Sequence, residues 1–445
     1  MSNTSVFTEN LRVYNAEQFK QSVSDVGPTN IYLTFGRTRP WADENNPPQA
    51  NSSVESFNDV WRNMIGAKLV TGNDIRHAIP RNNWTANTVY NMYDNDEQIG
   101  YLFNNATPFF VVTSDWNVYK CLMNNYGKAS TVMPTQTILN SPVKEADGYI
   151  WKYMYTISAE ERLRFTTANY IPVRTLSVDN NSLQWRVQEG AIPGAIDVIE
   201  ITNGGSNYTN ANSITVTITG DGLGATAFAT INTVSNTVNS AIITNPGAGY
   251  TYGTVTITDT GTGTGAVAHP CIPPPGGHGS DALRELGGSY IIINPRIVRT
   301  EDGQLPATNE FRQIAILQDP VEYATNNVAT DIVYTQTTIM TLSTGSVDYY
   351  HDETVYQGIS LEEALFTGVV CAWDSSNNIV QLTNTTGTPI ADVLIGANSA
   401  AARFVESITA KELKEYSGHL LYTDNISPVT RADDQTEDFK IVLKF

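Results

Sequence analysis

The sequence is poor in charge and short of basic residues. Charged residues make up 16% of its 445 residues, well below the roughly 25% of an average domain. Lys and Arg total 26 against 45 Asp and Glu, which gives a formal net charge of −19. A chain this acidic repels a phosphate backbone, and no Lys/Arg cluster offsets the repulsion. Nucleic acid is therefore not an expected partner.

Cysteines are few, and long apolar runs are missing. The three cysteines, Cys121, Cys271 and Cys371, lie far apart in the sequence, and their odd number argues against a disulfide framework. The chain is therefore expected to fold in a reducing cytoplasm. The N-terminus lacks a secretory pattern, and no apolar run approaches the roughly 18 residues of a membrane span. We expect a soluble protein that does not insert into membranes.

The residues that are abundant favour strands and turns. Hydrophobic residues make up 41% of the chain, which suffices for packed cores. The length suggests roughly three domains. Asn, Thr, Ser, Gly and Tyr replace the missing charges, and these suit strands, tight turns and hydrogen-bonding surfaces. The predicted fold class is mainly β with minor α (α+β), multidomain, with a mixed α/β body and inserted small all-β modules.

A degenerate repeat lies near the middle of the chain. Residues 201–209 and 243–251 share the pattern Ile-Thr-Asn-x-Gly-x-x-Tyr-Thr. Each copy is followed by an alternating Thr/Val/Ile run and then by Gly-x-Gly-Ala, at 222–225 and 263–266. A repeat of about 40 residues made of strand and turn signals predicts a stacked β-unit. The repeat offers no acid, base or nucleophile for catalysis, so it indicates a surface-forming module.

Helix signals occur at two places outside the repeat. Ser52 and Glu55 fit a capping box, apolar residues follow at helical spacing, and Gly66 is the expected C-cap. Residues 409–412 hold a second capping box, before a short helix that Gly418 is expected to end. Strands are expected elsewhere in the body, at 31–35, 108–113, 118–122, 149–157, 290–293, 311–317, 420–423 and 439–445.

Composition shifts divide the chain into five segments. A Pro/Gly stretch at 273–277 ends the repeat, and a Thr/Val/Asn-rich stretch begins near Tyr356. The predicted segments are 1–195 and 276–355 as the first and second parts of the body, 196–275 as an inserted Gly/Thr-rich β-repeat module, 356–405 as an inserted small β-module, and 406–445 as the C-terminal helix and strands of the body.

Motifs for cofactors and metals are incomplete. Residues 261–266 resemble a dinucleotide fingerprint, but proline-rich sequence follows where a helix must begin. His269, Cys271 and His278 offer three ligands on a Pro/Gly loop, whereas a closed zinc site needs four. A calcium-like start at 94–97 lacks the turn glycine and the final Glu, where Ile99 and Asn105 stand. A solvated acidic turn is the favoured interpretation there. We expect no cofactor, no metal site and no enzymatic activity.

The best candidate for a contact site is Arg37-Thr-Arg39-Pro-Trp41. Two arginines and a tryptophan beyond a strand end are the residue types that dominate interface hot spots. The alternative is a buried Trp41 whose neighbours Arg37 and Arg39 form local ion pairs. Both interpretations stay open at this point.

Several segments, in order along the body, carry a family resemblance. They are Ile31-Tyr-Leu-Thr-Phe-Gly-Arg37 with Pro40-Trp41, residues 60–64, Ile79-Pro-Arg81 with Trp84, residues 118–122, residues 147–151 with Tyr153, residues 311–314, Ser417-Gly418 and residues 434–437. With these segments the chain resembles the gene-eight baseplate wedge proteins of T-even-like contractile-tailed bacteriophages. The segments 196–275 and 356–405 have no recognised counterpart there and look like insertions at loop tips.

The resemblance implies a structural protein of the virion tail baseplate, made and assembled in the host bacterial cytoplasm. It implies a homodimer that contacts other baseplate wedge subunits, acts in baseplate assembly and host attachment, and has no catalytic residues. The alternative function is a glycan-binding tail appendage, because Tyr and Asn on β-modules suit sugar contacts. Appendages of that kind are usually trimeric and distal, which distinguishes the two functions.

Overall fold

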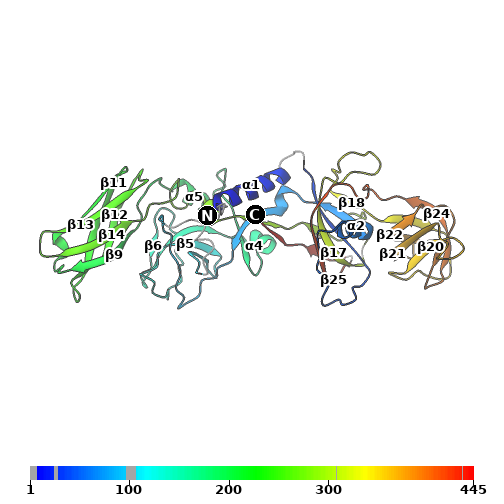
Figure 1. The fold of residues 1–445 in the computed structure, drawn as a ribbon, viewed down its shortest axis with the longest axis horizontal. Helices are drawn as coiled ribbons and strands as arrows, with labels where there is room; N and C mark the ends of the chain where they lie inside the picture. Colours follow the sequence, from blue (N-terminus) through cyan, green and yellow to red (C-terminus); the bar gives the residue numbers. More distant parts are fainter. Residues whose placement is uncertain (1–7, 25–28, 97–106, 307, 433) are drawn as a thin grey trace, which may run out of the picture. The chain divides into compact units, whose positions relative to one another are not determined.

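The computed structural model describes residues 8–96 except 25–28, and residues 107–445 except 307 and 433. These residues form two compact units, each built from separate stretches of chain (Figure 1). The first unit contains residues up to Gln18, Arg76–Ile292 and Val442–Phe445. The second contains Phe19–Ile75 and Ile293–Ile441. Each unit consists of a body sheet or sheets and one closed β-barrel.

The body of the first unit holds two four-stranded sheets. One has the order β4-β5-β7-β6 and the other β27-β15-β3-β8. The strands are β3 Ile75–Pro80, β4 Phe110–Val112, β5 Asn117–Met123, β6 Val143–Lys144, β7 Ile150–Thr156, β8 Tyr170–Val173, β15 Tyr290–Ile293 and β27 Ile441–Lys444. The helices are α1 Glu9–Ser24, whose residues up to Gln18 belong to this unit, α4 Ala159–Phe165, α5 Leu183–Glu189 and α6 Ala282–Glu285. The strands predicted at 108–113, 118–122, 149–157 and 290–293 are confirmed.

The β5–β7 ladder is buried on both faces. Tyr119 pairs with Tyr153 in the register, and their rings meet edge to face at 5.7 Å. These two rings belong to one apolar cluster with Trp151, whereas Val118 and Met154 belong to another cluster with Val13 of α1. Alternate residues of a strand point to opposite faces, so adjacent residues of β5 pack into two different cores.

The repeat segment forms a closed six-stranded barrel in the order β10-β11-β12-β9-β14-β13 (Figure 1). Its strands are β9 Ile199–Ser206, β10 Ile214–Gly220, β11 Leu223–Asn232, β12 Thr237–Ala248, β13 Gly253–Asp259 and β14 Thr264–Pro270, with the 3-10 turn η2 Ala211–Ser213 before β10. We call it the first barrel. The strands lie within the predicted range 196–275, and the glycine-rich residues 261–263 form the turn between β13 and β14.

The two repeats of the first barrel exchange strands. The first strand of each repeat pairs with the last strand of the other, β9 with β14 and β12 with β11, while β10 pairs with β13. Tyr208 of the first repeat lies against Gly263 of the second, and its hydroxyl accepts a hydrogen bond from Ala266 N at 3.4 Å. Tyr250 of the second repeat relates in the same way to Gly222 and Ala225 of the first. The repeat therefore encodes an internal two-fold exchange.

The body of the second unit is an antiparallel sheet, β18-β2-β1-β17-β25, packed against one helix. The strands are β1 Ile31–Gly36, β2 Met64–Leu69, β17 Glu310–Gln318, β18 Val333–Thr335 and β25 His419–Thr430, and the helix is α2 Val54–Asn63. A small ladder joins β16 Arg296–Val298 to β26 Thr436–Asp438. The 3-10 turn η1 Gly72–Asp74 precedes β3. The predicted strands at 31–35 and 311–317 are confirmed.

Both predicted ends of α2 were wrong. Ser53 is the N-cap, and its side chain accepts a hydrogen bond from Ser56 N, so Ser52 and Glu55 form no capping box. Gly66 lies inside β2, facing Tyr334 and Leu305, rather than closing the helix. The helix stops earlier because Met64 turns to extended backbone and pairs with Gly36 of β1.

The second unit also carries a closed barrel, in the order β19-β22-β21-β20-β23-β24. Its strands are β19 Thr338–Leu342, β20 Thr354–Gln357, β21 Phe366–Asp374, β22 Ile379–Gly387, β23 Val393–Gly396 and β24 Ala402–Thr409. We call it the second barrel. It includes β19 and the first two residues of β20, which precede residue 356, so it is longer than the predicted module 356–405. Its core includes Met340, Leu382 and Val405.

The helix predicted after residue 409 was wrong. Residues 410–418 are turns and an isolated bridge. The Glu412 carboxylate accepts a hydrogen bond from Thr335 N at 2.6 Å, and Leu413 N donates to the Gln336 side chain at 3.0 Å. These contacts to β18 and its extension replace the local hydrogen bonds of a helix.

The predicted fold class, mainly β with minor α and multidomain, is confirmed. Strands outnumber helices among the described residues, and α1 is the longest helix there at 16 residues. Within the described ranges, no helix combines the length and apolar character that crossing a membrane requires.

Candidate interaction surfaces

The predicted contact residues follow a sharp turn at the end of β1. A Cβ at Gly36 would lie 2.1 Å from Asn63 O, so only glycine fits there. Arg37 then adopts a left-handed conformation with φ of 61° and donates from its backbone N to Asn63 O at 2.9 Å. This turn brings the Arg37 guanidinium over the Trp41 ring, 3.7 Å from its centroid. At this distance the pair gains a cation–π attraction.

Trp41 and Arg39 are tied to segments far along the chain. Trp41 Nε1 donates to Ile426 O of β25 at 3.1 Å. Arg39 Nη2 donates to Thr354 Oγ1 of β20, in the second barrel, at 2.8 Å. All three predicted residues are half-buried. The structure thus brings Arg37 and Trp41 together and directs Arg39 to a different neighbour, while leaving part of each side chain open to solvent.

A buried arginine beneath this turn was missed from the sequence. Arg312 of β17 donates from Nε to both Glu44 carboxylate oxygens at 2.9 Å, from Nη2 to Glu310 at 2.6 Å, and from Nη1 to Thr38 O. Its side chain is 5% exposed, so these partners satisfy its charge in a poorly solvated place. The only sequence signal was an arginine next to Phe311 within a predicted strand.

Burial lowers the pKa of Arg37, and the nearby Asp59 carboxylate opposes this effect. Arg37 Nε is buried and makes no hydrogen bond within the described part of the chain. The alternative of a buried Trp41 beside local ion pairs does not fit, because Trp41 is only half-buried and its contacts are a stack and hydrogen bonds. A partner at this surface stays a prediction.

The three candidate metal ligands do not converge. His269 is exposed on β14, whereas His278 is buried and meets the Tyr93 ring edge to face at 5.0 Å. Cys271 N donates to Val198 O at the base of the first barrel. No set of three or more His, Cys, Asp or Glu residues in the described ranges is placed to hold a metal ion.

The acidic turn near residue 94 is only partly described. Asp94 accepts a hydrogen bond from Asp96 N at 2.9 Å, and Asn95 accepts one from Ile272 N at 2.9 Å. These contacts are those of a turn that supports the barrel base. Glu97, Ile99 and Asn105, on which the calcium comparison depended, lie outside the described residues.

A buried ionic group lies in the core of the first unit. Lys120 Nζ pairs with the Glu285 carboxylate, whose other oxygen accepts hydrogen bonds from Gly279 N at 2.7 Å and Asp281 N at 3.2 Å. Lys152 Nζ donates to Leu139 O at 2.9 Å, and burial lowers its pKa. Since a buried charge is tolerated only with such partners, this group positions α6 and its preceding loop.

A cavity of about 650 Å³ opens beside this group, within the first unit. Its walls combine aromatic, proline and polar side chains, among them Tyr93, Phe109, Tyr252, His269, Ile272, Arg284 and Glu285. This volume falls in the range of small-molecule sites. Tyr252 is largely exposed, so one aromatic face of the wall is open to solvent.

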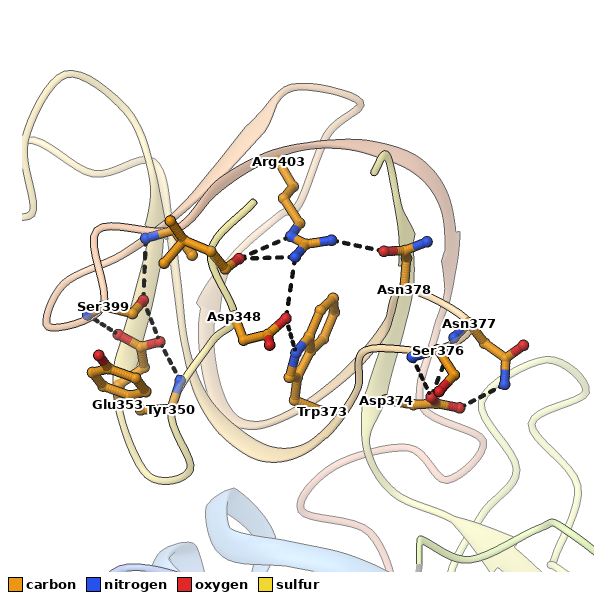
Figure 2. Close-up of polar contacts among 12 residues, drawn as sticks. Asp348, Tyr350, Glu353, Trp373, Asp374, Ser376, Asn377, Asn378, Ser399 and Arg403 are labelled. Atoms are coloured by element: carbon orange, nitrogen blue, oxygen red, sulfur yellow. Dashed lines mark hydrogen bonds and ion pairs between the residues drawn. The ribbon is translucent and has the colours of Figure 1, made fainter. Parts of the chain in front are cut away.

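One end of the second barrel is closed by a polar group around Arg403 (Figure 2). The guanidinium donates to Val347 O at 2.8 Å and to Asn378 Oδ1 at 2.7 Å, and lies 4.7 Å from the Trp373 ring. Asp348 accepts from both Arg403 Nη2 and Trp373 Nε1. Every donor nitrogen of Arg403 thus has an acceptor in the loops of the second barrel, which indicates a structural role rather than a ligand site.

The region around the Arg37–Trp41 turn matches a known family. The family described as Bacteriophage T4, Gp8 matches residues 5–132. A curated relative, baseplate wedge protein gp8 of Enterobacteria phage T4, is 25% identical over 38% of this chain. The predicted resemblance is confirmed. The match spans 60% of the length of the T4 gp8 protein. Both barrels lie beyond residue 132, outside the range that the Gp8 family matches.

Proposed function

We propose that this chain is a structural, non-enzymatic subunit of a phage tail baseplate wedge and is located in the virion. The observation that carries the proposal is the Gp8 match over residues 5–132, which include β1, α2 and β2 of the second unit and β4 and β5 of the first. These elements contribute to the cores of both bodies. The shared sequence is therefore the framework of the fold rather than a peripheral segment.

The chain joins neighbouring wedge subunits during baseplate assembly and host attachment, and it acts as a homodimer. Support comes from the name of the T4 relative, a baseplate wedge protein, and from the half-buried Arg37, Arg39 and Trp41, which are of hot-spot type. Two-fold association is also the commonest oligomeric form.

The test is reconstitution with the other structural tail proteins encoded by the same phage. The purified full chain is mixed with each of them, and complexes are detected by light scattering after gel filtration. A dimer that forms a defined complex with one or more of these proteins is the expected result. A chain that stays alone with all of them, or that is absent from purified tails by mass spectrometry, would contradict the wedge function.

One observation favours the alternative, a glycan-binding tail appendage. The cavity in the first unit presents Tyr93 and Tyr252 beside Glu285, Arg284 and His269, and aromatic faces with polar side chains suit sugar rings. Titration of oligosaccharides from the host cell surface, followed by isothermal calorimetry, separates the two functions. Saturable binding that Tyr252→Ala abolishes, in a trimeric chain, would favour the appendage.

A further inference from the structure

The second barrel exposes a group of aliphatic side chains at one end. Ile359 is 92% exposed and Leu365 is 76% exposed, and Leu361 and Ile390 are exposed as well. Scattered exposed aliphatics are ordinary, but a group of them marks an interaction site. We call these four residues the aliphatic tip.

The aliphatic tip is held in place by a buried side chain. Gln357, at the end of β20, donates to Ile390 O at 2.8 Å and accepts from Ile390 N at 3.0 Å. The Gln357 carbonyl accepts from Leu365 N at 3.0 Å. Gln357 is buried, so these bonds fix the loop after β20 beside the segment before β23. A surface ordered before binding loses less entropy when a partner docks.

The surroundings of the tip carry one sign of charge. Between Thr338 and Thr409 the sequence has eight Asp and Glu residues and a single basic residue of the Lys/Arg type, Arg403. That arginine is buried and fully bonded within the barrel. Glu362, Glu363 and Asp392 are exposed in the segments that carry the tip. The border of the apolar surface is therefore acidic.

We infer that the aliphatic tip docks onto another protein whose surface has an apolar recess bordered by Lys and Arg. This inference rests on the proposed function, because the partner is a neighbouring protein of the tail. Charge complementarity selects the occupant, since opposite charges on a rim favour encounter and like charges oppose it. A second copy would bring the same carboxylates face to face, and nucleic acid or an anionic membrane would meet the same repulsion.

The test compares matched variants of the full chain. The tip variant is Ile359→Ser with Leu365→Ser, and the charge variant is Glu362→Lys with Glu363→Lys. The control is Leu223→Ser with Val234→Ser in the first barrel, where both side chains are exposed to a similar degree, 81% and 93%. Because all these side chains are exposed, each variant should melt like the wild type, and circular dichroism verifies this.

Binding is measured by biolayer interferometry against each structural tail protein of the same phage, immobilised one at a time. The measurements are made at about 0.05 M NaCl, where charges are weakly screened, and at about 0.5 M NaCl, where they are strongly screened. For at least one of them, the tip variant should raise the Kd by about tenfold or more. The charge variant should weaken binding and reduce its salt dependence, and the control should bind like the wild type.

The outcomes separate this inference from the proposed function. If tail proteins bind and the tip variant keeps wild-type affinity at both salt concentrations, the docking inference is wrong and the wedge function stands. If no tail protein binds the wild type, the wedge function fails and the inference fails with it. If the tip variant only turns a dimer into a monomer, the occupant is a second copy, and the basic partner is wrong.

Discussion

Tyr208 lies so close to Gly263 that a Cβ there would be 2.2 Å from the tyrosine ring. The ring is buried and belongs to the other repeat, so it holds the two repeats together by contact that only glycine permits. Tyr250 makes the same contact with Gly222, where a Cβ would lie 2.4 Å from the ring. The two contacts are related by the exchange of strands between the repeats.

Replacing either glycine should therefore destabilise the first barrel. Gly263→Ala and Gly222→Ala should each cost about 1–3 kcal/mol, because added atoms force buried rings from their places. Gly253→Ala is the control, since a Cβ there would meet its nearest neighbour, the Pro270 ring, at 3.4 Å, which is an ordinary contact. Thermal unfolding followed by circular dichroism measures the effect. Unchanged melting of Gly263→Ala would mean that the ring moves freely.

Removing the whole first barrel should leave the rest of the first unit folded. Cys271 N donates to Val198 O at 2.9 Å, so the chain ends around residues 199–270 already meet. A Gly/Ser linker of a few residues can join them, because loop-closure entropy changes by only about 0.6 kcal/mol per doubling of length. The deletion protein should be soluble, with a cooperative thermal transition.

The control for that deletion removes only residues 237–270, which are the second repeat. Strands β9, β10 and β11 would then lose partners β12, β13 and β14. Exposed strand edges promote aggregation, so this protein should be insoluble while the complete deletion is not. Equal behaviour of the two would show that the repeats are not interdependent.

The buried His278 should make stability depend on pH. Burial, and then the charges of Lys120 and Lys152, lower its pKa well below 6.5. The imidazole of His278 therefore binds a proton near pH 6.5 in the unfolded chain, whereas in the folded chain it stays neutral at that pH. The neutral His278 makes its full contribution to the free energy of unfolding above pH 6.5. Below that pH the free energy of unfolding falls by up to about 1.4 kcal/mol per pH unit.

The matched variant for this effect is His278→Phe. Both ring nitrogens of His278 lack hydrogen-bond partners among the described residues, and a phenyl ring keeps the edge contact with Tyr93. Urea unfolding between about pH 7.5 and 5 gives the free energy of unfolding of both proteins. The wild type should lose stability relative to the variant as the pH falls. Parallel curves would contradict the shifted pKa.

Substitutions at Arg39 and Trp41 should distinguish the loss of a contact with a partner protein from a loss of stability. Trp41→Ala removes the Arg37 stack and the bond to Ile426 O, so it should destabilise the second unit by about 1–3 kcal/mol. Arg39→Ala loses one partly exposed hydrogen bond and should change stability by less than about 1 kcal/mol.

If this turn faces a partner, Arg39→Ala should weaken complex formation with tail proteins at unchanged melting temperature. Arg62→Ala serves as control, because Arg62 is an arginine of α2 whose ion pairs with Glu55 and Asp59 are near the surface. Equal complex formation by the wild type and both arginine variants would count against a contact site at Arg39.

The sequence repeat and the residue composition predicted much of the fold. The repeated Tyr and Gly-x-Gly-Ala pattern located the first barrel, and the strands around 31–35, 118–122 and 311–317 lie where runs of strand-forming residues predicted them. The exchange of strands could not be predicted, because a local repeat is satisfied equally by pairing within a repeat or between repeats. The second barrel begins before the composition changes, because β19 pairs with β22 and β24 through its backbone.

The errors share a physical cause, which is that distant partners outweigh local signals. The capping pattern at residue 409 is genuine as sequence, but Glu412 bonds to Thr335 instead of its own backbone neighbours. The candidate contact residues were found by type, whereas their partners Thr354 and Ile426 lie more than 300 residues away. A single sequence holds no signal for such contacts.

Closure of both barrels has a consequence for crowding. A strand at the edge of an open sheet leaves a row of peptide groups that can pair with another molecule. Every strand of each barrel has a hydrogen-bonded neighbour on both sides, so neither barrel has a free edge strand for such pairing. Many copies packed side by side can therefore meet only through side chains, and recognition between them is decided by the residues on their outer faces.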